Sequence, residues 1–140
     1  MRTKAARAAA PDEARELAKL CARIADDKKG ERVVILRMTE LIGLLDYFVI
    51  ASGGSRPQVQ AIADEINETM RKLRVPCRSM EGYEDGRWVL LDCGDVVVHV
   101  FETMTREFYD LERLWADAPR VRWRRTTRGV GAATSEGSGS

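Results

Sequence analysis

Residues 87–101, Arg-Trp-Val-Leu-Leu-Asp-Cys-Gly-Asp-Val-Val-Val-His-Val-Phe, decide how this chain folds. Two runs rich in apolar and β-branched residues, 87–92 and 95–101, flank the dipeptide Cys93-Gly94. A two-residue loop that ends in glycine suits a turn that needs positive φ at that position. The stretch is therefore predicted to form a β-hairpin.

The hairpin is predicted to have two faces of different character. If Asp92 lies opposite Asp95, one face carries only aliphatic side chains, those of Val89, Leu91, Val96, Val98 and Val100. Such a face is typical of a sheet covered by helices. The other face mixes apolar and polar groups, with Trp88 paired to His99 and Leu90 paired to Val97. Apolar strips rimmed by polar groups often mark partner surfaces.

The rest of the chain is predicted to supply helices and strands around this hairpin. Apolar periodicity and turn residues predict a helix over 12–29, strands over 32–38 and 47–51, a helix over 56–73 and a short edge strand over 77–80. A last helix, capped by Thr103 or Thr105, is expected to pack on the sheet through Met104, Phe108, Leu111 and Trp115. The order α-β-β-α-β-β-β-α predicts an α/β sandwich with a mixed sheet covered by helices.

Composition divides the chain into an acidic body and two basic ends. With 140 residues, 44% hydrophobic and 32% charged, it suits one globular domain with tails. Residues 1–11 carry +3 and residues 120–140 carry +4, so a total of +1 leaves −6 for residues 12–119. We expect a flexible basic arm, one domain, and an Arg-rich then Gly/Ser-rich flexible tail. An acidic body binds phosphate backbones poorly and basic proteins well.

The cysteines and the hydropathy pattern bear on the compartment. Cys21, Cys77 and Cys93 are odd in number and scattered, so neither a disulfide framework nor a zinc site is predicted. No apolar run has the length of a membrane span, and Met1 to Ala10 contains no leucine-rich core of a signal peptide. A reducing cytoplasmic location without membrane association is the expectation.

Three blocks of sequence stand out: Asp-Tyr-Phe-Val-Ile-Ala-Ser at 46–52, Leu-Leu-Asp-Cys-Gly-Asp-Val-Val-Val-His-Val-Phe at 90–101, and Phe-Tyr-Asp-Leu-Glu-Arg-Leu-Trp at 108–115. Together they strongly resemble the ribosomal silencing factor (RsfS, Iojap) family. The resemblance covers roughly residues 12–119 and implies a nucleotidyltransferase-like α/β fold. One departure is Cys93, which stands where the family usually has Tyr in Leu-Asp-Tyr-Gly.

The resemblance implies a translation repressor, not an enzyme, with no cofactor and no metal. Such a factor would bind the large ribosomal subunit through ribosomal protein L fourteen, block association with the small subunit and lower translation under nutrient limitation. The residues assigned to partner binding are Trp88, Leu90, Asp92, Asp95 and His99, with Tyr109 and Glu112 as second choices. An alternative is that the same apolar strip is buried in a homodimer, which would then compete with the ribosome.

Two other functional classes stay open. A nucleotidyltransferase could use Gly54-Ser55 at a helix start to hold a phosphate, but the strand over 77–80 contains no acidic residue for the metal. The single histidine, His99, also disfavours catalysis. An RNA-binding accessory factor of large-subunit assembly could use the basic tail, whose candidate contacts are Arg120, Arg122, Trp123, Arg124, Arg125 and Arg128.

Overall fold

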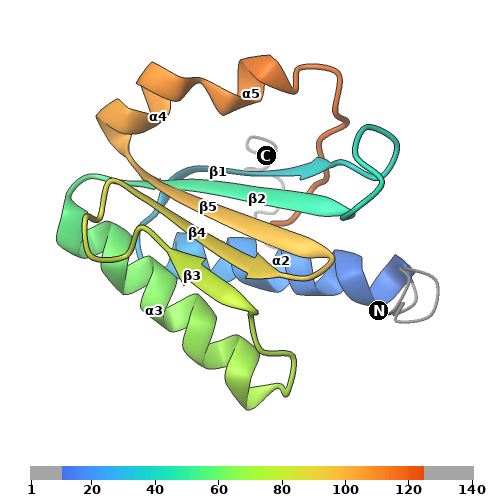
Figure 1. The fold of residues 1–140 in the computed structure, drawn as a ribbon, viewed down its shortest axis with the longest axis horizontal. Coiled ribbons are helices and arrows are strands. Elements are labelled where there is room, and N and C mark those ends of the chain that lie inside the picture. Colours follow the sequence, from blue (N-terminus) through green and yellow to red (C-terminus); the bar gives the residue numbers. More distant parts are fainter. Residues whose placement is uncertain (1–10, 125–140) are drawn as a thin grey trace, which may run out of the picture.

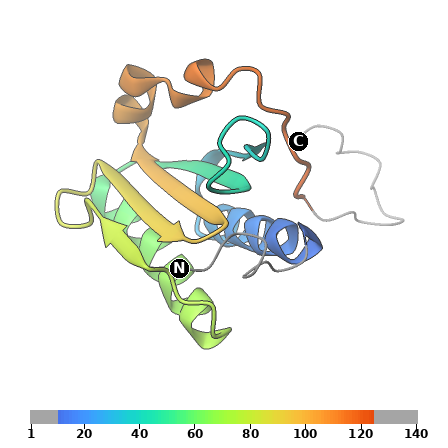
Figure 2. The ribbon, with the colours of Figure 1, turned by 45° about the vertical axis from the view of Figure 1, so that its right-hand side comes forward.

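A computed structural model describes residues 11–124 as a five-stranded sheet between two layers of helix (Figure 1). The elements are α2 (Pro11–Asp27), β1 (Glu31–Arg37), β2 (Tyr47–Gly53), α3 (Arg56–Lys72), β3 (Ser79–Glu81), β4 (Trp88–Cys93), β5 (Val96–Glu102), α4 (Thr103–Tyr109) and α5 (Leu111–Leu114). Helices α2 and α3 lie on one face of the sheet, and α4 and α5 lie over the other (Figures 1 and 2).

The sheet is mixed, as predicted. Its strands follow the order β1-β2-β5-β4-β3, in which β2 and β5 are parallel and every other neighbouring pair is antiparallel. The predicted α/β class with a mixed sheet is therefore confirmed. The predicted single last helix is wrong, because the chain forms α4 and α5 in its place.

The start of α3 shows how local sequence fixes an element. Ser55 is the N-cap, and its Oγ accepts a hydrogen bond of 3.3 Å from the Gln58 backbone N–H. The Gln58 side chain accepts from the Gly54 N–H at 2.8 Å and donates to the carbonyls of Lys28 and Lys29 at 3.2 and 2.9 Å. The cap therefore also ties α3 to the end of α2.

The hairpin forms with a register two residues away from the predicted one. Its loop is Gly94-Asp95, so Cys93 pairs with Val96. Gly94 has φ +85° at the first loop position, which suits a type II′ turn. Because the shift is two residues, every side chain keeps its predicted face. The aliphatic face is buried against α2 and α3, as predicted; it comprises Val89, Leu91, Val96, Val98 and Val100.

The domain does not end before residue 120, so the prediction that a free tail starts there is wrong for residues 120–124. This segment lies along β1, where Val121 N–H donates to the Ile35 carbonyl at 2.9 Å. Trp123 is 4% exposed, and its Nε1–H donates to the Val33 carbonyl at 3.0 Å. The segment thus covers the free edge of β1 and adds an indole to the core beneath the sheet.

The structure also joins Cys77 to Cys93 by a disulfide, which the sequence analysis did not predict. The two cysteines come together because β3 pairs antiparallel with β4, although 16 positions separate them in the chain. Cys21 is buried in α2, and this burial raises the pKa of its thiol to about 12.

Candidate partner-docking surface

The face of the sheet beneath α4 and α5 is largely a second core. Trp88 lies opposite Phe101, and Leu90 lies opposite His99, all on this face. The fully buried members of this core are Leu36, Met38, Phe48, Ile50, Val97, Phe101 and Ala118. Trp88 and Leu90 are only half-buried, so the part of this face that remains accessible lies on β4.

His99 supports this face from below and does not reach the surface. Its ring is 4% exposed and lies 4.6 Å from the Phe48 ring centroid. Nδ1 accepts a hydrogen bond of 3.2 Å from Trp88 Nε1, which places the imidazole proton on Nε2. Burial lowers the pKa of His99 to about 4, so the ring is neutral at pH 7. Direct partner contact by His99, proposed from the sequence, therefore does not fit its position; it positions Trp88.

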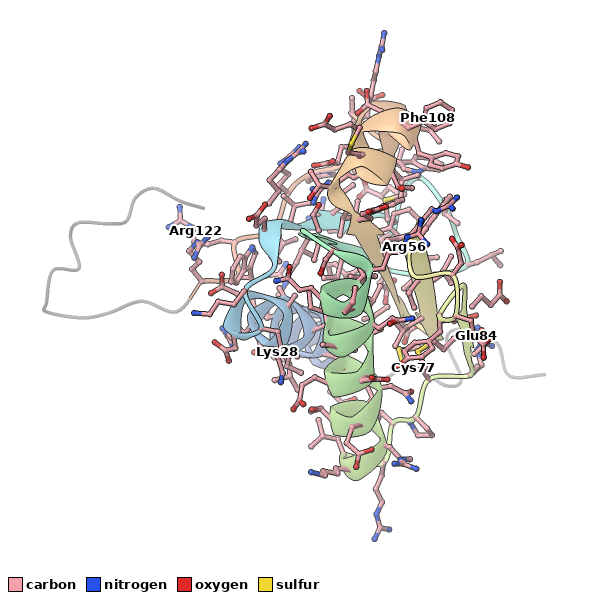
Figure 3. All side chains as sticks on the ribbon, turned by 90° about the vertical axis from the view of Figure 1, so that its left-hand side faces the viewer. Lys28, Arg56, Cys77, Glu84, Phe108 and Arg122 are labelled. Atoms are coloured by element: carbon pink, nitrogen blue, oxygen red, sulfur yellow. A yellow bond between two sulfur atoms is a disulfide. The ribbon has the colours of Figure 1, made fainter. Side chains whose placement is uncertain are left out.

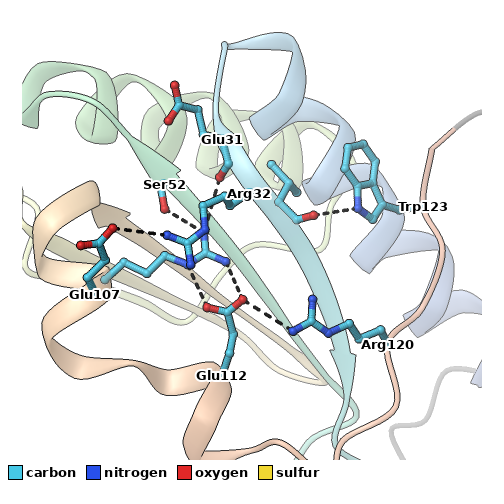
Figure 4. Close-up of polar contacts among 9 residues, drawn as sticks. Glu31, Arg32, Ser52, Glu107, Glu112, Arg120 and Trp123 are labelled. Atoms are coloured by element: carbon cyan, nitrogen blue, oxygen red, sulfur yellow. Dashed lines mark hydrogen bonds and ion pairs between the residues drawn. The ribbon is translucent and has the colours of Figure 1, made fainter. Parts of the chain in front are cut away.

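Arg106 is the central polar group between α4 and the sheet. Its side chain is 1% exposed, and Nε and Nη2 donate to the two carboxylate oxygens of Glu112 at 3.0 and 2.9 Å. Nη1 donates to Ser52 Oγ at 2.7 Å and to the Glu31 carbonyl at 3.4 Å (Figure 4). This bidentate, charge-assisted arrangement fixes α4 and α5 together over the sheet.

Glu112 is consequently occupied inside the protein. Burial alone would raise the pKa of its carboxyl, but the hydrogen bonds and charge of Arg106, with Arg32 and Arg120 nearby, hold the pKa below its usual value. Its side chain is 15% exposed. We therefore assign Glu112 a structural role instead of the partner contact proposed from the sequence.

The break between α4 and α5 is at Asp110. This residue has φ 48° and ψ 52°, a left-handed conformation that ends α4 and lets the chain turn before α5. Asp residues tolerate this conformation better than most. A single helix over this stretch would have carried one apolar stripe, whereas two short helices orient their residues independently.

With Arg106 buried, the apolar residues of α4 face outward. Met104 is 76% exposed and Phe108 is 80% exposed, so the prediction that both pack on the sheet is wrong. Of the four residues in the predicted stripe, only Leu111 and Trp115 pack against the second core. Two large apolar side chains of α4 are thus left on the surface.

Phe108 and Tyr109 continue the accessible apolar surface of β4. The Tyr109 ring centroid lies 4.9 Å from that of Trp88 and 5.0 Å from that of Phe108. Figure 3 shows Phe108 projecting from α4 at one end of the molecule. We call Trp88, Leu90, Phe108 and Tyr109 the docking surface, because they form one contiguous apolar strip across two elements.

A recess of about 290 Å³ adjoins the docking surface. It is lined by Glu81, Gly82, Trp88 and Leu90. Gly82 has φ +82°, and a Cβ there would lie 2.1 Å from the Trp88 carbonyl oxygen. Only glycine therefore allows the chain after β3 to approach Trp88 this closely.

The two predicted acidic contacts lie at the turn of the hairpin, Asp95 within the loop and Asp92 near the end of β4. The carboxylate oxygens of Asp92 each accept from Arg78 Nη2 at 3.2 Å, and Oδ1 also accepts from the Gly94 N–H at 3.0 Å. The backbone carbonyl of Asp95 accepts from the N–H groups of Asp46 and Tyr47 at 2.8 and 3.0 Å. Asp92 is therefore already paired with a cation, and the Asp95 backbone joins the hairpin turn to the start of β2.

The arginines predicted to contact RNA lie partly on the edge of β1. Arg120 reaches Glu112 at 3.8 Å, and Arg124 lies over the Trp123 ring and 3.9 Å from Asp26. Arg122 is exposed and makes no ion pair within residues 11–124. Stacking of Trp123 on a base does not fit the structure, because the indole is buried. Arg125 and Arg128 lie outside the described residues.

The residues that a nucleotidyltransferase would use to hold a phosphate take part in capping a helix instead. Gly54 and Ser55 serve the cap of α3. Within residues 11–124 no group of three or more His, Cys, Asp or Glu side chains could hold a metal ion. Over the same range, no helix has the length and apolar character that crossing a membrane requires.

Comparison with known proteins decides the family. The family model described as ribosomal silencing factor during starvation matches residues 11–138. The chain belongs to the ribosomal silencing factor family. A ribosomal silencing factor of Halalkalibacterium halodurans is 48% identical over 106 residues, covering 76% of this chain and 91% of that protein. The resemblance predicted from residues 46–52, 90–101 and 108–115 is thus confirmed.

The chain is also similar to a solved structure and to a more distant mouse protein. A crystal structure from Bacillus halodurans superimposes with a TM-score of 0.69 at 45% identity, covering 77% of this chain and 98% of the other. A mouse protein named mitochondrial assembly of ribosomal large subunit protein 1 is 32% identical over 88 residues, covering 59% of this chain and 38% of that protein.

Proposed function

We propose that this ribosomal silencing factor binds the large ribosomal subunit through ribosomal protein L fourteen and sterically blocks association with the small subunit. Family membership supports the silencing role, and the name of the mouse relative supports the large subunit as the partner. The observation that carries the proposal is the docking surface. It leaves the Phe108 side chain 80% exposed and the Tyr109 side chain 52% exposed, beside half-buried Trp88 and Leu90.

The charge of the domain suits a basic partner. Residues 12–119 carry a net −6, so they attract a basic protein and favour productive encounters with it. Aromatic side chains such as those of Phe108 and Tyr109 then supply most of the binding energy when a partner buries them. The acidic Asp92 and Asp95 lie on the same hairpin as Trp88 and are proposed to form part of the polar rim.

The direct test is sedimentation of the purified full chain with separated large and small subunits. We expect comigration with the large subunit alone and a reduced yield of joined ribosomes when the small subunit is added. Absence of binding to either subunit at moderate salt would overturn the proposal. The alternative is that a second copy of the chain covers the docking surface in a homodimer. The apparent mass of the protein would then rise with its concentration, and the dimer would dissociate when large subunits are added.

Phe108→Glu is expected to weaken large-subunit binding at least about tenfold, because it places a charge on the most exposed aromatic side chain of the docking surface. The domain should remain folded, since the Phe108 side chain is 80% exposed. The matched control is Leu73→Glu, which places the same charge at a residue 50% exposed at the far end of α3. Equal binding by both variants would exclude this docking surface.

We further propose that Arg122 contacts ribosomal RNA next to the docked domain. Its exposed guanidinium has no ion pair within residues 11–124 and continues the row of Arg120 and Arg124 along β1. Arg122→Glu is expected to reduce the slope of log affinity against log salt by about 1, the effect of losing one phosphate contact. Lys72→Glu, on exposed α3, is the control of equal charge change. An unchanged salt slope for Arg122→Glu would remove the RNA contact.

A further inference from the structure

The Cys77–Cys93 disulfide lies at the outer edge of the sheet. Both cysteines are half-buried, and β3 is the last strand in the sheet order (Figure 3). Accessible disulfides are open to attack by thiolates, whereas buried ones are protected. The bond is therefore positioned where a dithiol reductant can reach it.

Few other interactions hold β3 in place. It pairs with β4 over only three residues, and its other edge has no strand partner among residues 11–124. The neighbouring ion pair between Arg78 and Asp92 is exposed, with side-chain exposures of 69% and 31%, and such pairs contribute little. The next firm attachment is Tyr83, whose hydroxyl donates to Asp64 at 2.8 Å. Between the end of α3 and Tyr83, Arg78 N–H donates to the Asp92 carbonyl at 2.6 Å and Met80 packs on the core, and the disulfide is the covalent link to β4.

This same segment forms one wall of the recess beside the docking surface. Glu81, which pairs with Leu90 at the end of β3, and Gly82 line the recess together with Trp88 and Leu90. A change in the order of β3 therefore reaches Trp88 and Leu90, two of the four residues of the docking surface, through the β3–β4 pair and the shared recess.

We propose that Cys77 and Cys93 form a reversible redox site that controls the docking surface. The disulfide keeps residues 74–82 ordered and the recess shaped for a partner, and reduction releases this segment and weakens docking. The control of docking rests on the proposed function, whereas the redox site and the release of β3 do not.

The chemistry is thiol–disulfide exchange with a dithiol reductant. One thiolate of the reductant attacks a sulfur of the Cys77–Cys93 bond, which breaks as a mixed disulfide forms. The second thiol of the reductant then displaces this sulfur. In total two electrons and two protons pass to the protein, which gains two thiols, while the reductant becomes a cyclic disulfide. The third cysteine, Cys21, takes no part because it is buried.

The first experiment measures thiols and local order in the full chain. After denaturation and alkylation, we expect one modified cysteine in the oxidised protein and three after treatment with dithiothreitol, in agreement with three cysteines in the sequence. Hydrogen exchange of peptides covering residues 75–82 should become at least about tenfold faster on reduction, while that of β5 stays unchanged. Three modified cysteines after incubation with oxidised glutathione would overturn the redox site.

The second experiment separates regulation from docking. Oxidised Cys21→Ala and the double variant Cys77→Ser/Cys93→Ser are compared for large-subunit binding in one reductant-free buffer. We expect the double variant to bind roughly tenfold more weakly, because its docking surface is less preorganised. Equal binding overturns the regulation and leaves the docking proposal intact. If neither the variants nor the wild type bind the large subunit, the docking proposal is overturned, and the proposed regulation of docking with it. The redox site is still decided separately by the thiol counts and the hydrogen-exchange rates.

Discussion

Replacing Glu112 with glutamine is expected to lower the free energy of unfolding by about 3–5 kcal/mol, because it leaves a buried guanidinium unpaired. Arg106 is 1% exposed and donates to both Glu112 oxygens, at 3.0 and 2.9 Å. A neutral amide offers one acceptor and no opposing charge. The loss is measured by urea denaturation followed by far-UV circular dichroism.

Two variants make the Glu112 experiment specific. Glu107→Gln removes the same charge from a side chain that is 65% exposed and 3.9 Å from Arg32, so it should change stability by less than about 1 kcal/mol. The double variant Arg106→Met/Glu112→Leu removes both charges and should lose less stability than Glu112→Gln alone. A Glu112→Gln variant as stable as Glu107→Gln would show that the pair does not hold α4 and α5.

The sequence predicted the sheet and the two helices beneath it because their signals are local. Alternating Val residues from Val96 to Val100 place one face against helices whatever the register. Ser55 at the N-cap and Pro57 in the first turn are local signals of a helix start, and the structure shows the cap there. Such features depend on neighbours in sequence, so one chain without a structure reveals them.

The orientation of α4 could not be read in the same way. Apolar spacing favoured Phe108 in the core, but the structure buries Arg106, whose partners Ser52 and Glu31 lie 54 and 75 positions away in the chain. Only the fold brings these acceptors together. Asp110 adds a left-handed residue that hydrophobic periodicity does not detect. Phe108 was therefore missed as part of the docking surface.

Long-range contacts also explain the errors at the chain end and in the hairpin. The arginines around Trp123 favour a tail, yet its hydrogen-bond partner Val33 lies 90 positions away in the chain. A loop at either Cys93-Gly94 or Gly94-Asp95 keeps every face of the hairpin unchanged, so the pattern could not choose between them. Of the seven residues proposed for partner binding, Trp88, Leu90 and Tyr109 form the docking surface with Phe108.

Protonation of His99 is expected to lower the free energy of unfolding by about 3 kcal/mol as the pH falls from 7 to 4. Burial between Phe48, Phe101 and Trp88 lowers its pKa from 6.5 to about 4. Between these two values the unfolded chain binds a proton that the folded protein excludes. The free energy of unfolding is therefore at its full value above pH 6.5 and decreases toward pH 4.

Glu112 affects the free energy of unfolding over a lower pH range than His99, so the two contributions can be measured separately. Because its pKa is held below the ordinary value of 4.5, its contribution is present above that pH and is lost as the pH falls through the lower, folded value. Stability measured between pH 6.5 and pH 5 therefore reports mainly on His99. Urea midpoints at half-unit steps over this range give the slope directly.

His99→Asn is the control that keeps the hydrogen bond and removes the titration. The asparagine Oδ1 can accept from Trp88 Nε1 in place of Nδ1, and the amide takes up no proton in this range. The variant is expected to be less stable than wild type at pH 7 but nearly independent of pH between 6.5 and 5. Equal slopes for both proteins would contradict a buried neutral His99. If the free energy of unfolding is independent of pH only in the variant, protonation of the His99 ring destabilises the wild-type protein. This ring accepts the hydrogen bond of the Trp88 indole, so the destabilised region lies directly beneath the docking surface.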